Sequence, residues 1–404
     1  MLKKLLKVLG LVIALVVLGV GGFVGWVQLD GIPKYAPGRI ELKVEVTPER
    51  IARGKPFVSM LCANCHLNPT TRQLTGKVMI DAPPEFGKIV SKNITQHPVK
   101  GIGGWTDGEL AYLIRTGISR DGQYIPPYMA KLPHLADEDL KSIIAFLRSD
   151  DPMVQAADVD PPGKTEPSFL SKFLCHVAFK PLPYPAETIV VPPASDKIAL
   201  GKYLVFGLEC WTCHSGDFKK MNMAEPEKSY LYLGGGNQMR NLDGQTVVTA
   251  NLTPDEETGI GKWSEADFLR ALKRGFRPDG TLVRYPMDLF TELSDDEVGA
   301  IYAYLRTVPK IHNAVLRPPA LVAEGDVGRK LYYKYGCVSC HASDGVGLAD
   351  LRTNLKHYPT EDQLKAWIKN APSIKPETKM PAWDGLIAEV DYPPLIAFVR
   401  SLAQ

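Results

Sequence analysis

The chain has 404 residues, of which 45% are hydrophobic and 23% charged, so it is long enough for about two to four domains with proper cores. This composition excludes a disordered or low-complexity protein. The formal net charge is only +2, which gives no indication of a nucleic-acid partner.

The first thirty residues predict a membrane anchor. Residues 8–27 form an uncharged run made mostly of Val, Leu, Ile and Gly, long enough as a helix to cross ~30 Å of hydrocarbon. Lys3, Lys4 and Lys7 precede the run, so the N-terminus should stay in the cytoplasm and the rest should lie on the periplasmic side of the inner membrane. A cleavable signal peptide is the alternative, but no small-x-small cleavage site follows the run. We therefore predict a retained single-pass anchor over residues 1–29.

One short motif, Cys-x-x-Cys-His, occurs three times. Two cysteines at this spacing present their thiols to the two vinyl groups of one haem, and the adjacent histidine is then placed to coordinate the iron. A zinc site fits less well, because zinc knuckles need paired Cys-x-x-Cys units close together and these motifs lie far apart. The motifs therefore predict three covalently bound haem c groups. The cysteines are Cys62, Cys65, Cys210, Cys213, Cys337 and Cys340, and the histidines are His66, His214 and His341.

The chain also contains an internal duplication. Residues 93–95 and 101–107 match residues 251–253 and 259–265, all at an offset of 158 positions. Thr106 and Ser264, near the ends of the matching segments, each look like the N-cap of an amphipathic helix. Asn93 and Asn251 are interpreted as turn-forming residues, with a hydrogen bond to a haem propionate as the alternative.

The elements around each motif follow one order. A glycine in a helix-like stretch lies eight or nine residues before each motif, at Gly54, Gly201 and Gly328. An amphipathic helix closes each segment, at residues 137–148, 295–306 and 393–400, and an arginine ends all three. We predict a mainly α fold of three tandem class I cytochrome c-like domains behind an N-terminal transmembrane helix. The predicted domains are residues 46–150, 196–310 and 323–404.

Proline-rich segments separate the predicted domains. Residues 151–195 contain nine prolines and predict a linker between the first two domains, and residues 311–322, with Pro318 and Pro319, predict a shorter one. Inside the first linker, Cys175 precedes a histidine, but Lys172 stands where a first cysteine would be needed. A haem held by one thioether at Cys175 is one interpretation, but we favour another. We predict that Cys175 is buried as a small hydrophobe in a short helix packed on a neighbouring domain, through Phe169, Leu170, Phe173 and Leu174.

The second axial ligand of each iron decides between electron transfer and catalysis. In the third domain Met380 is the one methionine after Cys337, it precedes Pro381, and its rival is His357. The 158-residue offset also aligns Met129 with Met287, both in proline-containing loops just before a closing helix. We therefore predict Met129, Met287 and Met380 as ligands. The competing methionines are Met79 in the first domain and Met221, Met223 and Met239 in the second.

These residues resemble a known group of proteins. The three motifs, the Asn-Ile/Leu-Thr and Gly-Ile-Gly-x-Trp segments and the Tyr285-Pro286-Met287 loop are similar to the multihaem cytochrome c subunits of membrane-bound alcohol and gluconate dehydrogenases. The resemblance is strongest over residues 46–310, and the third domain resembles a generic class I cytochrome c. It implies His/Met ligation at all three irons and periplasmic electron transfer between a dehydrogenase and the respiratory chain. The chain departs from the family in its anchor and in the Pro127–Ala130 segment, where the family more often has Met-Pro.

The predicted function is that of a membrane-anchored electron carrier without substrate chemistry of its own. Three six-coordinate haems offer no open iron, and the sequence contains no flavin or nicotinamide fingerprint. We expect redox protein partners, a dehydrogenase or a respiratory complex. The alternatives are a multihaem enzyme with one open haem, of the peroxidase or thiosulfate-oxidising type, and a fixed cytochrome subunit of a larger respiratory or photosynthetic assembly.

Overall fold

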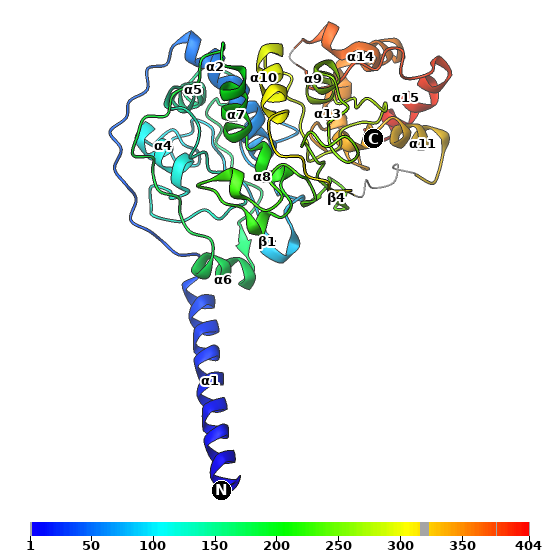
Figure 1. Ribbon diagram of the computed structural model, residues 1–404. Coiled ribbons are helices and arrows are strands. Elements are labelled where there is room, and N and C mark those ends of the chain that lie inside the picture. Colours follow the sequence, from blue (N-terminus) through cyan, green and yellow to red (C-terminus); the bar gives the residue numbers. More distant parts are fainter. Residues whose placement is uncertain (1, 316–322, 377, 404) are drawn as a thin grey trace.

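The computed structural model describes residues 2–315, 323–376 and 378–403. A head built mainly of helices stands on one long helix, α1 (Leu2–Asp30), which extends away from the head as a stem (Figure 1). The mainly α fold predicted from the sequence is confirmed. Part of the second predicted linker, residues 316–322 with Pro318 and Pro319, lies outside the described residues.

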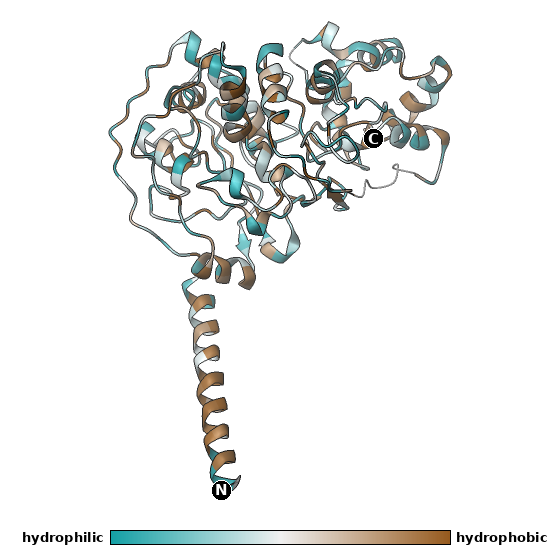
Figure 2. Ribbon diagram, viewed as in Figure 1, coloured by the Kyte–Doolittle hydropathy of each residue, from teal (hydrophilic) through white to brown (hydrophobic). Residues whose placement is uncertain are grey.

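The stem is apolar over most of its length. Hydrophobic residues run along α1, and the charged lysines lie at its free end (Figure 2). By length and composition, residues Lys3–Asp30 suffice to cross a membrane, and the apolar window of this helix is not buried by the head. The helix extends the predicted run of residues 8–27 in both directions.

The head contains three groups of four helices in the same order, which we call units 1, 2 and 3. Each unit has an opening helix, a short helix carrying the Cys-x-x-Cys-His motif, a capped helix and a closing helix. Unit 1 comprises α2 (Pro48–Phe57), α3 (Ala63–His66), α4 (Asp107–Thr116) and α5 (Asp137–Leu147). Unit 2 comprises α7 (Lys197–Gly207), α8 (Cys210–His214), α9 (Glu265–Arg274) and α10 (Asp295–Leu305). Unit 3 comprises α11 (Val327–Lys334), α12 (Val338–His341), α14 (Glu361–Ile374) and α15 (Tyr392–Ser401).

The remaining elements are short. A π-helical turn, Val58–Cys62, joins α2 to α3, and α13 (Leu351–Asn354) follows the third motif. Two antiparallel ribbons pair β1 (Gly87–Lys88) with β2 (Glu166–Pro167), and β3 (Gln238–Arg240) with β4 (Thr246–Val248). Single 3-10 turns lie at Pro84–Phe86, Phe218–Lys220, Pro226–Lys228, Leu355–His357 and Glu389–Asp391.

The opening and closing helices of each unit cross at a glycine. A Cβ atom added to Gly54 would lie 1.9 Å from the carbonyl oxygen of Ser142 in α5, and one added to Gly201 would lie 1.9 Å from that of Ala300 in α10. The same atom on Gly328 would lie 2.2 Å from the carbonyl oxygen of a proline in α15. No side chain fits at these distances, so the glycines noted before each motif are what allow the two backbones to touch.

The arginine at the end of each closing helix holds a loop. Arg148 donates to the carbonyl oxygens of Ile102 and Trp105, and Arg306 donates to that of Gly261. Arg400 donates to the carbonyl oxygens of Tyr358 and Pro359. In every unit the loop that is held leads directly into the capped helix, whose N-cap is Thr106, Ser264 or Thr360. The arginines therefore fix tertiary contacts in addition to complementing the helix dipoles.

The hydrophobic interior runs through units 1 and 2 without a break, and unit 3 has a core of its own. At the junction of units 1 and 2, Arg53 of α2 binds both carboxylate oxygens of Asp139 and also reaches Glu297 of α10 at 2.6 Å. Burial alone would raise the pKa of Glu297, but hydrogen bonds from Arg53 and from the Ser294 backbone lower it overall. Units 1 and 2 therefore share an apolar core that is bordered by a charged pair.

The first proline-rich segment is packed along unit 1 and contains the predicted short helix, α6 (Phe169–Val177). Cys175 is fully buried, as expected. Phe169 and Leu170, however, were expected to face a neighbouring domain and are each 40% exposed. The reason is that the helix turns its small residues, Ser171 and Cys175, toward the protein and packs against the end of α1.

Replacing Gly201 by alanine tests the helix crossing. The new methyl group would meet the backbone of α10, which cannot rotate away, so we expect the free energy of unfolding to fall by about 1–3 kcal/mol despite the gain in helix propensity. Ile198→Ala in the same helix, at a residue that is 51% exposed, is the matched control and should change stability by less than about 0.5 kcal/mol. Denaturant unfolding followed by far-UV circular dichroism measures the stability of both variants. Equal stabilities of the two variants would contradict the role of Gly201 at the helix crossing.

Candidate functional site

The three motif histidines are held in the same way. The Nδ1 atom of His66 lies 2.7 Å from the carbonyl oxygen of Lys92, and that of His214 lies 2.8 Å from the carbonyl oxygen of Ala250. His341 makes the same contact with Ala349 at 3.1 Å. A carbonyl accepts only from a protonated nitrogen, so the hydrogen is assigned to Nδ1 and the lone pair to Nε2. Within the described part of the chain, no hydrogen bond reaches the Nε2 atom of these three rings.

A glycine completes each histidine support. The backbone N–H groups of Gly76, Gly235 and Gly347 donate to the carbonyl oxygens of His66, His214 and His341, at 2.8, 2.7 and 3.1 Å. Gly76 and Gly235 have positive φ angles, and a Cβ atom on either would lie within 2.5 Å of the backbone of the segment that carries the supporting carbonyl. We did not predict these glycines. The sequence did contain a signal for two of the supporting carbonyls, because Lys92 and Ala250 directly precede the duplicated Asn-x-Thr segments.

The chemistry of the donor set fits haem c. Burial raises the pKa of Cys62, Cys210 and Cys337 to about 12, so the cysteines are neutral thiols, and none of the motif cysteines is in a disulfide. Burial lowers the pKa of His66, His214 and His341, which keeps each ring neutral, the form that coordinates a metal. Each motif therefore offers two thiols and one imidazole with a free Nε2, the groups that a covalently attached haem requires.

Asn93 and Asn251 form equivalent buried turns. The Oδ1 atom of each accepts from the backbone N–H and the hydroxyl group of the threonine two residues later. The Nδ2 atom of Asn93 donates to the carbonyl oxygens of Ala157 and Val159, and that of Asn251 donates to Thr258 and to the carbonyl oxygen of Ile311. Both side chains are used in shaping the chain, which agrees with the turn interpretation rather than with a propionate contact.

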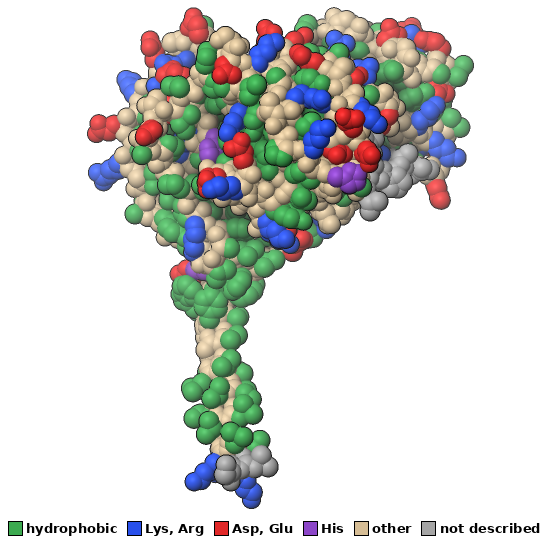
Figure 3. Space-filling model, viewed as in Figure 1, with side chains coloured by type: hydrophobic (Ala, Val, Ile, Leu, Met, Phe, Trp, Pro, Cys, Tyr) green, Lys and Arg blue, Asp and Glu red, His purple; other side chains and the backbone are tan. Residues whose placement is uncertain are grey.

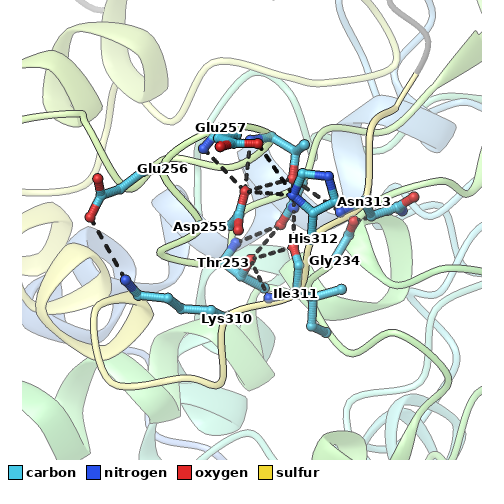
Figure 4. A network of polar contacts seen from close by, with 11 residues as sticks. Gly234, Thr253, Asp255, Glu256, Glu257, Lys310, Ile311, His312 and Asn313 are labelled. Carbon is cyan, nitrogen blue, oxygen red and sulfur yellow. Dashed lines mark hydrogen bonds and ion pairs between the residues drawn. The ribbon is translucent and has the colours of Figure 1, made fainter.

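The turn that joins Asn251 to Thr253 belongs to a larger polar network, in which Figure 4 labels Thr253 and its neighbours. Thr253 accepts from the backbone of Ile311, and Asn313 donates to the carbonyl oxygens of Gly234 and Gly235. Lys310 and His312 lie 3.7 Å from carboxylate oxygens of Glu256 and Asp255, respectively. The chain leaving α10 is thereby tied to the glycine loop that supports His214.

The three candidate methionines occupy matching positions in three loops. The residue three positions after each methionine donates its backbone N–H to a carbonyl near the end of the capped helix. These hydrogen bonds are Leu132 to Ile114 (2.9 Å), Phe290 to Leu272 (3.0 Å) and Trp383 to Lys369 (2.8 Å). The alignment of Met129 with Met287 therefore extends to Met380, although the sequence around Met380 gave no such match.

The competing residues are placed differently. The thioether of Met239 accepts a hydrogen bond from Asn237 at 3.8 Å. Met221 and Met223 pack against the shared core, as Met287 also does, so this contact does not separate them from Met287. Met79 lies in a short backbone pairing with Ile89, and His357 is exposed at the end of a 3-10 turn. Ligation by Met129, Met287 and Met380 stays a prediction.

Comparisons with known proteins agree with this geometry. A family model described as cytochrome c matches residues 198–309, and one described as cytochrome C oxidase, cbb3-type, subunit III matches residues 323–399. The gluconate 2-dehydrogenase cytochrome c subunit of Pantoea cypripedii is 30% identical over 315 residues, which cover 72% of this chain and 68% of that protein. The chain belongs to the family of dehydrogenase cytochrome c subunits. The resemblance stated from the sequence is thus confirmed.

Two further members of the family match over a similar range. The cytochrome c subunit of the quinone alcohol dehydrogenase of Gluconacetobacter polyoxogenes is 29% identical over 311 residues, which cover 71% of this chain and 64% of that protein. The fructose dehydrogenase cytochrome subunit of Gluconobacter japonicus is 29% identical over 328 residues, which cover 72% of this chain and 63% of that protein. The chain thus spans less than two thirds of the length of these two relatives. Cytochrome c domains carry covalently bound haem c, which is the cofactor that the motif geometry fits.

In this member of the family, the methionine loop of unit 2 lies between the other two units. The hydroxyl group of Tyr285 donates to Asp81 of unit 1 at 2.6 Å, and Asp288 forms an ion pair with Lys379 of unit 3. Lys379 also donates to the carbonyl oxygen of Ser59, next to the first motif. The residues flanking Met287 and Met380 are therefore in direct contact with each other and with unit 1.

Asn251→Ala separates a structural role from a role in binding haem. Removing the amide leaves the Thr253 N–H buried without a partner and leaves the Ile311 carbonyl with the 3.3 Å bond from the Thr253 hydroxyl, so we expect the free energy of unfolding to fall by about 1–3 kcal/mol. Asn241→Ala is the control, because Asn241 also accepts from two backbone N–H groups but does so in an exposed turn, and its loss should cost about 1 kcal/mol or less. Reduction potentials should stay unchanged in both variants, and a potential shift in Asn251→Ala without loss of stability would instead indicate a propionate contact.

Proposed function

We propose that this chain is a membrane-anchored c-type cytochrome with three haems, which transfers electrons between a dehydrogenase or respiratory complex and a downstream acceptor. In this proposal α1 is a single-pass anchor in the inner membrane and the head lies on the periplasmic side. The lysines at the free end of α1 and its exposed apolar length support this orientation.

One observation carries the proposal: the same histidine support and the same methionine loop occur in all three units. A supporting carbonyl, a supporting glycine and a methionine loop anchored to the capped helix accompany each motif. The supporting carbonyl follows its histidine at very different separations, since Lys92, Ala250 and Ala349 lie in loops of unlike length. Because three loops of different length place the same groups around the motif histidine, we infer that the three motifs meet the same structural requirement.

The residues then take the following roles. The cysteine pairs Cys62/Cys65, Cys210/Cys213 and Cys337/Cys340 attach one haem each, and the paired ligands are His66 with Met129, His214 with Met287 and His341 with Met380. A bound haem c would supply an iron that accepts and releases one electron. With an imidazole and a thioether as its protein ligands, that iron would have no position open to substrate, and the thioether would favour the reduced state. The corresponding domains are residues 46–150, 196–310 and 323–404, with residues 151–195 as linker.

The contacts between units support electron transfer through the head. Tyr285, Asp288 and Lys379 bring the ligand loops of units 2 and 3 against unit 1. The names of the relatives place them in dehydrogenases that act on an alcohol, fructose or gluconate, so a dehydrogenase is the partner that we propose.

Haem counting tests the number of sites. The intact protein should carry three haems by mass spectrometry and by haem-to-protein absorbance ratio. Each double variant that replaces both cysteines of one motif by alanine should lose one haem. Cys175→Ala is the matched control and should retain three, because Cys175 is buried in α6 and lacks a second cysteine at the required spacing. Two haems in the intact protein, or four, would contradict the proposal.

Met287→His tests the methionine ligand of unit 2. An imidazole in place of the thioether should leave the haem low-spin but lower one of the three reduction potentials by on the order of 0.1 V, within the ~0.8 V range that axial ligands span. Met239→His, in the same unit, is the control and should leave all three potentials in place. A high-spin haem in the unmodified protein would favour a catalytic cytochrome instead, because that haem would have an open position.

A further inference from the structure

The short helix α6 lies where the stem meets the head. It crosses the end of α1 at the foot of the head (Figure 1) and packs against it. The rings of Phe173 and Phe23 are 6.1 Å apart, and those of His176 and Trp26 are 4.4 Å apart. His176 also donates from Nε2 to the carbonyl oxygen of Gly31 at 3.0 Å, and Val27 of α1 is fully buried. The position of α6 along α1 is therefore fixed.

The polarity of α6 is the reverse of that of a helix in a soluble protein. Its buried face carries Ser171, which donates to the carbonyl oxygen of Phe86, and Cys175. Three of its large apolar side chains face outward, with Val177 51% exposed and Phe169 and Leu170 each 40% exposed, whereas Phe173 and Leu174 are half-buried. Hydrophobic side chains continue from the stem onto the foot of the head (Figure 3). Such a surface is unfavourable in water and calls for an apolar partner.

The length of α1 indicates what that partner is. At ~1.5 Å per residue, residues 8–27 span ~30 Å, the thickness of the hydrocarbon layer, so Trp26 and Leu29 lie at its outer boundary. Leu29 is 90% exposed, and Trp26 is 49% exposed beside α6. An aromatic residue at this depth is typical of a membrane interface. Since α6 packs on residues 23–31 of the chain, it lies at the same depth.

We propose that α6 is an interfacial helix, whose apolar face of Phe169, Leu170 and Val177 lies in the outer boundary of the bilayer. This inference rests on the proposed role of α1 as a membrane anchor. The apolar face enters the acyl boundary, and Lys172 of the same helix suits the headgroup phosphates. Because α6 lies in the bilayer boundary and also packs on α1, it holds the head against the membrane surface at a fixed height and orientation.

Site-directed spin labelling of the full-length protein tests this proposal. A nitroxide is attached at Leu170→Cys, and separately at Val177→Cys, in a Cys175→Ala background whose haem cysteines are consumed as thioethers. The protein is reconstituted in phosphatidylcholine/phosphatidylglycerol vesicles with its haems oxidised. Collision rates with oxygen, which partitions into lipid, and with a water-soluble nickel chelate are then measured. Val16→Cys in the middle of α1 and Val390→Cys in unit 3, which is 80% exposed, are the controls.

The expected result is an oxygen-to-nickel ratio at residues 170 and 177 that is several-fold higher than at residue 390, and lower than at residue 16. If the ratio at residues 170 and 177 equals that at residue 390 while residue 16 lies in lipid, the proposal that α6 is an interfacial helix is wrong. The proposal that α1 is a membrane anchor would still hold. Low accessibility to both reagents at 170 and 177 would show that protein covers α6 and would also overturn the proposal. A nickel-accessible residue 16 would overturn both the anchor and the interfacial helix.

Discussion

The close crossing of the opening and closing helices is the constraint on which the head depends. At Gly54, Gly201 and Gly328 the backbone of one helix lies against a carbonyl of the other, and any side chain would force the helices apart. Each crossing fixes the opening helix against the closing helix, and the haem motif begins within a few residues of the end of the opening helix. The arginine at the end of the closing helix holds the loop before the capped helix.

Around this frame, backbone groups of the described residues position each motif histidine. The supporting carbonyl and glycine N–H impose the ring orientation without requiring particular side chains. Unit 3 can therefore omit the Asn-x-Thr and Gly-Ile-Gly-x-Trp segments and still place His341 as the longer units place theirs. The longer units use the added residues for buried turns, of which the network around Asn251 and Ile311 is an example.

The units are joined by two kinds of contact. Units 1 and 2 share an apolar core bordered by Arg53 and Glu297, whereas unit 3 has its own core and is bound through Lys379 and Asp288 beside two candidate ligand loops. Asp288 of this pair is buried, and Phe276 and Leu282 of unit 2 also pack against the core of unit 3. Unit 3 is therefore joined to the rest of the head by apolar contacts as well as by a charged pair.

The sequence by itself determined the parts of this protein that are encoded by local spacing. The Cys-x-x-Cys-His motifs, the apolar run of α1, the N-caps Thr106 and Ser264 and the closing helices all depend on residues that are neighbours in the chain. Only the tertiary structure decided which carbonyls support the histidines, how the loop of Tyr285 and Asp288 lies between units 1 and 3, and that α6 turns its apolar face outward beside α1. Those features depend on backbone groups, which are the same in every residue, and on contacts between segments far apart in the chain, neither of which leaves a local pattern.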